Sequence, residues 1–351
     1  MLGPGAFLVL KNSSHRLAAT ERRNPRSRKL DQLATRELLM MMNREDRLVP
    51  RAVGREIAPI TRAVEIVAKA LENGGRLIYV GAGTSGRLAA LDAAECPPTF
   101  GVPPRLVQAI VAGGRRALTR AAEGVEDSAV QGARDLAARK IGRRDVVIGV
   151  SASGSTPYVL GALRFARKRG AKTVLLTSNR NSPARRTAHI TIAPHTGPEV
   201  ITGSTRMKAG TAQKLILNML STAAMIRLGR VYNNWMVDLN MSNAKLRRRG
   251  LRILREATGA RAAEAKRALA KSGSLRVALM MLKTGASASE ARRTLQQTGG
   301  NLWQALAAHS GASVQPSRAK RSIEAGLRRT SLQKPGLRKP GLRKPALEKK
   351  V

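Results

Sequence analysis

The chain has 351 residues, of which 42% are hydrophobic and 2% aromatic, so it is long enough to bury a core made mainly of aliphatic side chains. Its 64 lysine and arginine residues against 22 acidic residues give a formal net charge of +42, which attracts polyanions. A single cysteine, Cys96, excludes an internal disulfide, and no run of roughly 18 apolar residues could form a membrane span. The apolar stretch near the start has no basic residue before it, so we expect no signal peptide and a cytoplasmic location.

The first two thirds of the chain begin with helical patterns and continue into alternating strands and helices. Apolar residues at helical spacing predict one helix over 31–48 and a second over 53–71, which ends at Asn73-Gly74-Gly75. A long apolar helix over 207–228 closes this part. The alternation between them predicts an α/β fold with a parallel sheet covered on both faces. The expected strands lie near Leu77, Val107 and Val147 and over 173–177 and 190–192.

The last third is helical and then repetitive. Beyond Lys245 the sequence is rich in alanine, with Ser287 and Glu290 at the spacing of a capping box and a helix stop at Gly299-Gly300. From Lys334 a five-residue repeat carries a proline each time, which predicts a disordered tail whose charge favours nonspecific polyanion binding. We expect an N-terminal arm with helices (1–64), an α/β domain (65–230), a helical region (231–311) and a basic disordered tail (312–351).

Two loops of glycine and hydroxyl residues each follow a predicted strand and lead into a helical pattern. They are Gly-Ala-Gly-Thr-Ser-Gly at 81–86 and Ser-Ala-Ser-Gly-Ser-Thr at 151–156. Glycine lets the backbone approach an anion closely, and a helix that begins there directs free N–H groups at the anion. Together the loops predict a site for a phosphorylated small molecule. No lysine of the P-loop type follows either loop, which argues against nucleoside triphosphate hydrolysis.

Other classes of protein remain alternatives. The first loop also satisfies the G-x-G-x-x-G pattern of dinucleotide-binding folds, but no acidic residue ends the next strand at 105–111 to hold a ribose. The basic surface allows nucleic-acid binding, although aromatic residues are not interleaved with the charges. The four histidines are scattered and form no ligand spacing with Cys96, so no metal site is expected.

Longer strings around these loops are more specific than either loop. They resemble the N-acetylmuramic acid 6-phosphate etherases, which carry a sugar isomerase (SIS) domain, and the resemblance extends from about residue 20 to about residue 310. Two residues depart from the family pattern: Ser155 stands where arginine is expected, and Ala89 where glycine is expected. The matching strings lie at 81–88, 91–101, 123–127, 153–158, 197–214 and 218–222.

The resemblance implies a fold and an activity. It implies a flavodoxin-like SIS domain, with a parallel sheet flanked by helices, and a small C-terminal bundle similar to ubiquitin-associated domains. The implied enzyme is a carbon–oxygen lyase that cleaves the D-lactyl ether of N-acetylmuramic acid 6-phosphate by elimination and water addition. It needs no metal or organic cofactor, and it forms a homodimer. A sugar-phosphate isomerase is the alternative enzyme.

The resemblance also implies roles for individual residues. It places the two catalytic glutamates at Glu95, expected to protonate the departing lactate, and at Glu126, expected to remove the C2 proton. Glu199 is expected to contact the sugar. By similarity to sugar-phosphate isomerase domains, the phosphate is expected to be held by Ser85, Ser151, Ser153 and Thr156.

The position of Glu95 creates a geometric difficulty. A helix that ran unbroken from Gly86 to Glu95 would place the carboxylate roughly 13 Å from the phosphate-binding end. A hexose phosphate is shorter than that. Either the chain bends, helped by Pro97-Pro98 ending the helix at Cys96, or Glu95 serves the site of a neighbouring subunit.

Overall fold

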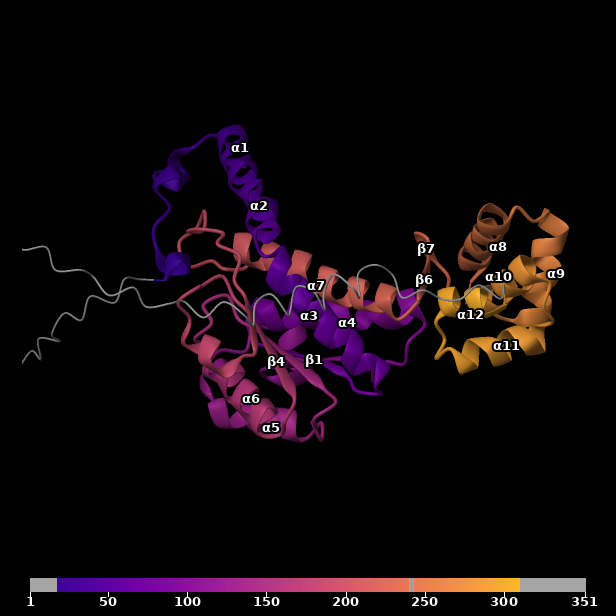
Figure 1. Cartoon of the computed structure of the whole chain (residues 1–351). Coiled ribbons are helices and arrows are strands. Elements are labelled where there is room, and N and C mark those ends of the chain that lie inside the picture. Colours follow the sequence, from indigo (N-terminus) through magenta and orange to yellow (C-terminus); the bar gives the residue numbers. More distant parts are fainter. Residues whose placement is uncertain (1–17, 240, 242, 310–351) are drawn as a thin grey trace, which may run out of the picture. The chain divides into compact units, whose positions relative to one another are not determined.

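The computed structural model describes residues 18–239, 241 and 243–309 (Figure 1). The expected basic tail over 312–351, with its proline repeat, lies outside the described residues, as does the start of the N-terminal arm. In the part that is described, no helix is both long and apolar enough to cross a membrane.

A parallel sheet of five strands, in the order β2-β1-β3-β4-β5, forms the centre of the α/β part. Every residue of β1 (Leu77–Gly81) and of β3 (Val146–Val150) is buried, as expected for parallel strands covered on both faces. The predicted strands and their parallel arrangement are confirmed. The remaining strands are β2 (Val107–Val111), β4 (Lys172–Leu176) and β5 (Ile190–Ile192).

Two hydrophobic cores lie on opposite faces of the sheet, because successive side chains of a strand point to opposite sides. Leu77 and Tyr79 belong to one core, and Ile78 and Val80 belong to the other. The first core is completed by α3 (Ile57–Glu72), α4 (Gly83–Phe100) and α7 (Lys208–Arg227), and the second by α5 (Ala129–Ala137) and α6 (Pro157–Lys168), as Figure 1 shows.

The N-terminal helices begin and end at other residues than expected. The helix predicted over 31–48 is a short 3-10 turn (Leu30–Gln32) followed by α1 (Thr35–Asp46), and the next helix, α2 (Leu48–Gly54), ends before α3 begins. The break falls at Glu56, whose buried carboxylate accepts the Ala193 N–H at 3.0 Å. A contact between residues 137 positions apart therefore lies at the break between the two helices.

The expected end of α4 at Cys96 is wrong. The helix includes Pro97 and Pro98 and continues to Phe100, where Gly101 closes it in the left-handed conformation at φ 61°. Proline removes two backbone donors, but its fixed φ is compatible with a helix. Burial of Cys96 and Phe100 in the first core compensates for the lost hydrogen bonds.

The C-terminal helices have a hydrophobic core of their own. The capping box is confirmed, because the Ser287 N–H donates to Glu290 at 2.8 Å and the Glu290 N–H donates to Ser287 Oγ at 3.3 Å. A short antiparallel hairpin, β6 (Val231–Tyr232) with β7 (Trp235–Met236), precedes the helices and was not expected. The helices are α8 (Ala244–Thr258), α9 (Ala262–Ser272), α10 (Leu275–Thr284), α11 (Ala288–Gln297) and α12 (Leu302–His309).

Helices α5 and α6 approach each other through glycine. A Cβ on Gly161 would lie 1.9 Å from the Ala129 carbonyl oxygen, and a Cβ on Gly132 would lie 2.0 Å from the Tyr158 carbonyl oxygen. Both contacts are with backbone, which cannot move aside without separating the helices. Glycine is therefore required at this crossing.

We predict that Gly161→Ala lowers the free energy of unfolding by about 1–3 kcal/mol or more, because the methyl group overpacks a backbone contact. The matched control is Gly54→Ala at the end of α2, where nothing lies within 4 Å of the added Cβ. That variant should be neutral, or more stable by up to about 1 kcal/mol. Urea unfolding followed by circular dichroism measures both, and equal stability of the two variants would contradict the packing argument.

Candidate functional site

The second glycine- and hydroxyl-rich loop joins β3 to α6 and brings three of the predicted phosphate ligands together. Ser151 Oγ lies 2.7 Å from Thr156 Oγ1 and 3.5 Å from Ser153 Oγ, and it accepts the Gly154 N–H at 3.0 Å. Thr156 is the N-cap residue of α6, and Pro157 is its first residue. The hydroxyls thus gather at the positive end of a helix dipole, an arrangement that suits a phosphate group.

Residues after β4 hold this loop in place, and the sequence analysis did not identify them. Ser182 Oγ donates to the Gly154 carbonyl, Thr177 Oγ1 donates to the Ala152 carbonyl, and Asn179 Nδ2 donates to the Ser153 carbonyl. These contacts explain why Gly154 is glycine, since a Cβ there would lie 2.2 Å from Ser182 Oγ. The polar string that follows β4 was the available signal in the sequence.

The first loop joins β1 to α4 and carries Ser85 in the first turn of the helix. Gly81 and Gly86 allow strand and helix to meet, because a Cβ on Gly81 would lie 2.8 Å from the Gly86 nitrogen. Strands β1 and β3 are neighbours, with Gly81 level with Val150, so the two loops leave the same edge of the sheet side by side. Among the described residues Ser85 Oγ makes no hydrogen bond, which leaves it available to a ligand.

Glu126 lies on the segment that follows β2, the other neighbour of β1. It is half-buried in a short 3-10 turn (Val125–Asp127) that packs against α6. The earlier part of this segment is held by Arg87 of α4, which donates to the carbonyls of Ala117 and Arg120 at 2.9 Å. Glu126 therefore shares the sheet edge from which both predicted phosphate loops emerge.

Glu95 is not brought to this edge. It is exposed on α4, ten residues beyond Ser85, which corresponds to about 15 Å along an unbroken helix. Asp92, three residues before it, is instead buried and accepts hydrogen bonds from Tyr79 Oη at 2.8 Å and Ser221 Oγ at 3.0 Å. Leu91 lies one turn before Glu95 and is 52% exposed. Because α4 is unbroken between Ser85 and Glu95, the chain does not bend early, and the explanation that remains is that Glu95 serves a neighbouring subunit.

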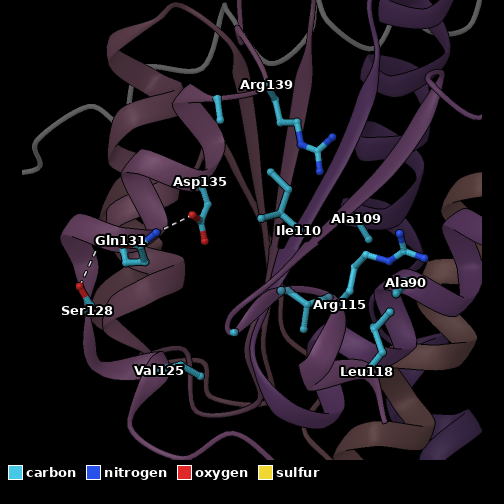
Figure 2. A pocket seen from close by; sticks show the side chains of 14 residues that line it. Ala90, Ala109, Ile110, Arg115, Leu118, Val125, Ser128, Gln131, Asp135 and Arg139 are labelled. Carbon is cyan, nitrogen blue, oxygen red and sulfur yellow. Dashed lines mark hydrogen bonds between the residues drawn. The ribbon is translucent and has the colours of Figure 1, made fainter. Parts of the chain in front are cut away.

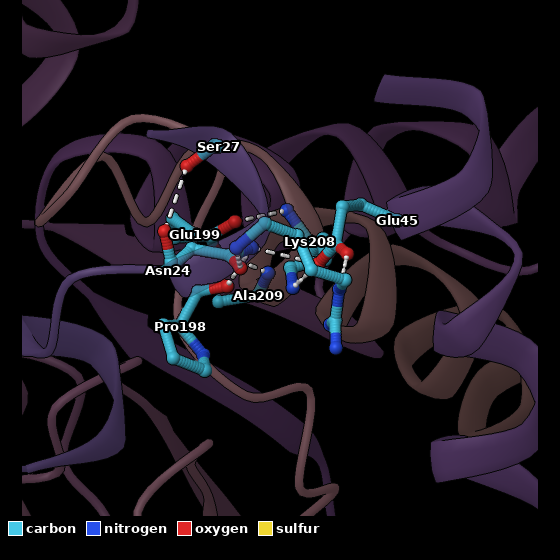
Figure 3. A network of polar contacts seen from close by, with 8 residues as sticks. Asn24, Ser27, Glu45, Pro198, Glu199, Lys208 and Ala209 are labelled. Atoms are coloured by element: carbon cyan, nitrogen blue, oxygen red, sulfur yellow. Dashed lines mark hydrogen bonds and ion pairs between the residues drawn. The ribbon is translucent and has the colours of Figure 1, made fainter. Parts of the chain in front are cut away.

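Glu199 precedes α7 by nine residues, and its side chain is buried against the start of that helix, with 1% of the residue's surface exposed. Its two carboxylate oxygens accept the backbone N–H groups of Lys208 (3.0 Å) and Ala209 (2.9 Å), as Figure 3 shows. Burial raises the pKa of Glu199, while these two hydrogen bonds act in the opposite direction. The carboxylate caps a helix in this structure, and its expected contact with the sugar stays a prediction.

A buried ion pair lies beside this cap. Lys208 Nζ is 2.6 Å from Glu45 Oε2, and both side chains are fully buried. Asn24 Nδ2 donates to Glu45 at 2.9 Å and to the Pro198 carbonyl at 3.3 Å, and Arg26 Nε donates to the second oxygen of Glu45 at 2.5 Å. Figure 3 shows these contacts, which connect the N-terminal segment, α1 and the beginning of α7.

A hollow of about 830 Å³ lies along the edge strand β2, next to the turn that carries Glu126 (Figure 2). Its acidic group, Asp135, accepts hydrogen bonds from Gln131 at 2.6 Å and from Tyr158 Oη at 2.5 Å. None of the predicted site residues lines the hollow, although Val125 next to Glu126 does.

The described residues offer no metal site, and the structure shows the surroundings of Ser155 and Ala89, the two residues that differ from the family pattern. Across residues 18–239, 241 and 243–309, no group of three or more His, Cys, Asp or Glu side chains is placed to hold a metal ion. Ser155 is exposed, and its hydroxyl donates to Ser153 Oγ at 2.9 Å, so it extends the hydroxyl cluster where the family pattern has arginine. Ala89 is fully buried in the first core.

Comparison with known proteins identifies the family. Residues 59–167 match the profile of the glucokinase regulatory protein N-terminal SIS domain, and residues 114–223 match the SIS domain. The N-acetylmuramic acid 6-phosphate etherase of Actinobacillus pleuropneumoniae is 54% identical over 239 residues, which are 68% of this chain and 79% of that protein. The chain belongs to the N-acetylmuramic acid 6-phosphate etherase family.

Other relatives carry the same name. The protein of Serratia proteamaculans is 51% identical over 264 residues (75% of this chain, 89% of the relative), and that of Geobacillus thermodenitrificans is 51% identical over 265 residues (75% and 90%). A solved phosphoheptose isomerase from Francisella tularensis aligns with 54% of this chain and 98% of its own at 20% identity and a TM-score of 0.43, too weak a likeness to add to the assignment.

The Glu45 ion pair makes stability depend on pH. Burial alone would raise the pKa of Glu45, but hydrogen bonds from Arg26, Lys208 and Asn24 outweigh it and lower the pKa from 4.5 to about 2. A carboxyl group with a lowered pKa stabilises the fold above its unfolded pKa, and this contribution is lost as the pH falls through the folded value. The wild-type protein should therefore lose on the order of 3 kcal/mol from this group between pH 4.5 and pH 2.

We predict that Glu45→Gln is destabilised at pH 7 by about 3–5 kcal/mol, because Lys208 is left buried without a counter-charge. The same variant should have a flatter dependence of stability on pH below 4.5 than the wild-type protein. Denaturant unfolding at a series of pH values measures both quantities. Parallel curves for the two proteins between pH 4.5 and pH 2 would show that Glu45 does not titrate as described.

Proposed function

We propose that this chain cleaves the D-lactyl ether of N-acetylmuramic acid 6-phosphate, with Glu95 and Glu126 as its acid–base pair. Opening of the sugar ring makes C1 an aldehyde, which acidifies the hydrogen on C2. Glu126 removes that proton, and Glu95 protonates the lactate oxygen as it leaves C3. Water then adds to C3 with the roles of the two carboxyl groups reversed. The products are N-acetylglucosamine 6-phosphate and D-lactate.

The observation that carries the proposal is the cluster of Ser151, Ser153 and Thr156 hydroxyls at the start of α6, in a chain of this family. Neutral donors together with a helix N-terminus can bind a phosphate group without a metal ion. Ser85 emerges from the neighbouring strand end and supplies a further hydroxyl. A phosphate held there leaves the rest of the sugar free to extend toward Glu126.

We assign the catalytic unit to a homodimer in the cytoplasm. Glu95 is exposed and about 15 Å beyond Ser85 along α4, so a sugar phosphate bound at the loops of one copy does not reach Glu95 of that copy. If a second copy covers the exposed face around Leu91 and Glu95, Glu95 of the first copy can reach the phosphate loops of the second. The substrate is a small sugar phosphate, and no organic cofactor takes part in these steps.

The direct test is to supply N-acetylmuramic acid 6-phosphate and to measure D-lactate and N-acetylglucosamine 6-phosphate. Both products should form in equal amounts. Conversion of a ketose phosphate without release of lactate would instead identify a sugar-phosphate isomerase. The absence of both reactions would overturn the proposed activity.

We predict that Glu95→Gln and Glu126→Gln each reduce kcat by about a hundredfold or more, because glutamine keeps the shape of the side chain but cannot exchange a proton at neutral pH. The KM for the substrate should change little, since the phosphate contacts remain. Glu72→Gln, which alters an exposed carboxylate at the end of α3, is the matched control and should retain wild-type turnover. Wild-type turnover in both test variants would contradict the proposed acid–base roles of Glu95 and Glu126.

Exchange with deuterated water separates the two roles. Glu126→Gln should abolish exchange of the C2 hydrogen, whereas Glu95→Gln should retain it, because proton removal precedes departure of the lactate. The opposite pattern would interchange the acid and the base. Nuclear magnetic resonance of the substrate measures this exchange without requiring turnover.

Mixed dimers test whether sites are shared. Glu95→Gln and Ser153→Ala proteins should each have strongly reduced activity alone, but random mixing should restore about a quarter of wild-type activity if each site takes these residues from different copies. Mixing Glu126→Gln with Ser153→Ala is the control and should restore nothing, because both residues belong to the same copy's loops. No restoration in either mixture, with mixed dimers demonstrated, would place Glu95 in its own copy's site.

A further inference from the structure

A second hollow shares no lining residue with the loops that carry Ser85 and Ser151, although the segment 200–207 adjoins the first loop near Thr84. It encloses about 500 Å³ between the N-terminal segment 23–31, α1 and the segment 200–207 that leads into α7. We call it the arm pocket. Its volume is within the range of small-molecule sites. Its lining includes Arg23, Asn24, Arg28, Lys29, Met42 and Arg206.

The charge of the arm pocket is not balanced by the protein. Four cations line it, Arg23, Arg28, Lys29 and Arg206, against a single acid, Asp31. Among the described residues none of these four makes a hydrogen bond or an ion pair with another side chain. By contrast Arg26, in the same segment, is paired with Glu45. The four cations are exposed and line one hollow, and Arg206 lies more than 170 positions from the other three in the sequence.

The backbone at Lys29 is unusual. This residue lies in the left-handed region at φ 60° and ψ 31°, between the 3-10 turns Pro25–Ser27 and Leu30–Gln32. A residue with a Cβ adopts this conformation at a cost, and such residues concentrate at functional sites. The conformation at Lys29 brings a lysine to the wall of the arm pocket, where glycine would be the unstrained choice.

The base of the arm pocket is rigid. Asn24 is 2% exposed and donates to both Glu45 and the Pro198 carbonyl, so the N-terminal segment is fastened to α1 and to the segment before α7. Leu38 and Met42 of α1 contribute apolar surface. A hollow of this size, with four cations and an apolar side, has the chemistry to bind a small anion.

We propose that the arm pocket binds a small phosphorylated anion, at a site separate from the loops that hold the substrate phosphate. Arginine side chains hold phosphate oxygens through paired N–H donors, and Lys29 adds a point charge. The site is independent of the assignment of Glu95 and Glu126, and it would still bind if that assignment failed.

Calorimetric titration of the full chain with inorganic pyrophosphate at physiological salt tests the site. The triple variant Arg28→Gln/Lys29→Asn/Arg206→Gln should bind about tenfold or more weakly, because three charge-assisted contacts are lost. Asparagine is chosen at Lys29 because it tolerates the left-handed conformation. The single variant Arg206→Gln, which leaves the N-terminal segment unchanged, should show a weakening in the same direction if the triple variant fails to fold.

Two controls separate this site from other sources of binding. Arg248→Gln/Arg267→Gln/Lys271→Asn removes three exposed cations from α8 and α9. This control variant should change the affinity for pyrophosphate by less than about twofold. Equal losses of affinity in the two triple variants would mean diffuse electrostatic attraction and would overturn the proposal. Ser151→Ala/Ser153→Ala should keep pyrophosphate binding at the arm pocket. Loss of binding in that variant would assign the anion to the catalytic loops and also overturn the proposal.

Discussion

Parallel pairing of β1 with both β2 and β3 is the constraint on which the candidate site depends. The register sets Gly81 level with Val111 on one side and with Val150 on the other, so three strands end at one edge. Parallel strands require crossover connections, and the helices in those connections cover both faces of the sheet. The two loops predicted to hold the substrate phosphate therefore lie at the edge where strands end and helices begin. Ser85, Glu126 and Ser151 reach that edge from separate parts of the chain.

The ion pair of Glu45 and Lys208 forms a second connection, between the N-terminal segment and the start of α7. Two charges removed from water gain little net stability unless each is hydrogen-bonded. Here Asn24 and Arg26 satisfy the remaining capacity of the carboxylate. The same contacts that hold Lys208 also form the rigid base of the arm pocket. Helix capping by Glu199 at the next backbone groups adds to this junction.

One copy of the chain holds the phosphate-binding part of the proposed site but not both carboxylates. The cause is that α4 runs without a break from Gly83 past Glu95. A helix that begins at the phosphate loop carries every later residue away at about 1.5 Å per position. An exposed glutamate beside the exposed Leu91 is well suited to a surface that a second copy covers.

Local patterns were sufficient for part of this description. Apolar runs of strand length identified all five strands of the parallel sheet but not the β6–β7 hairpin, and glycine with hydroxyl residues after two of the five identified the loops, because these features depend on near neighbours in the chain. The contact of Glu56 with Ala193, the cap formed by Glu199 and the Glu45–Lys208 pair depend on partners from about ten to more than 160 positions away. No local pattern records such a partner. The sequence by itself determined the fold class and the type of ligand, whereas only tertiary packing decided which carboxylates are buried and which remain available to a substrate.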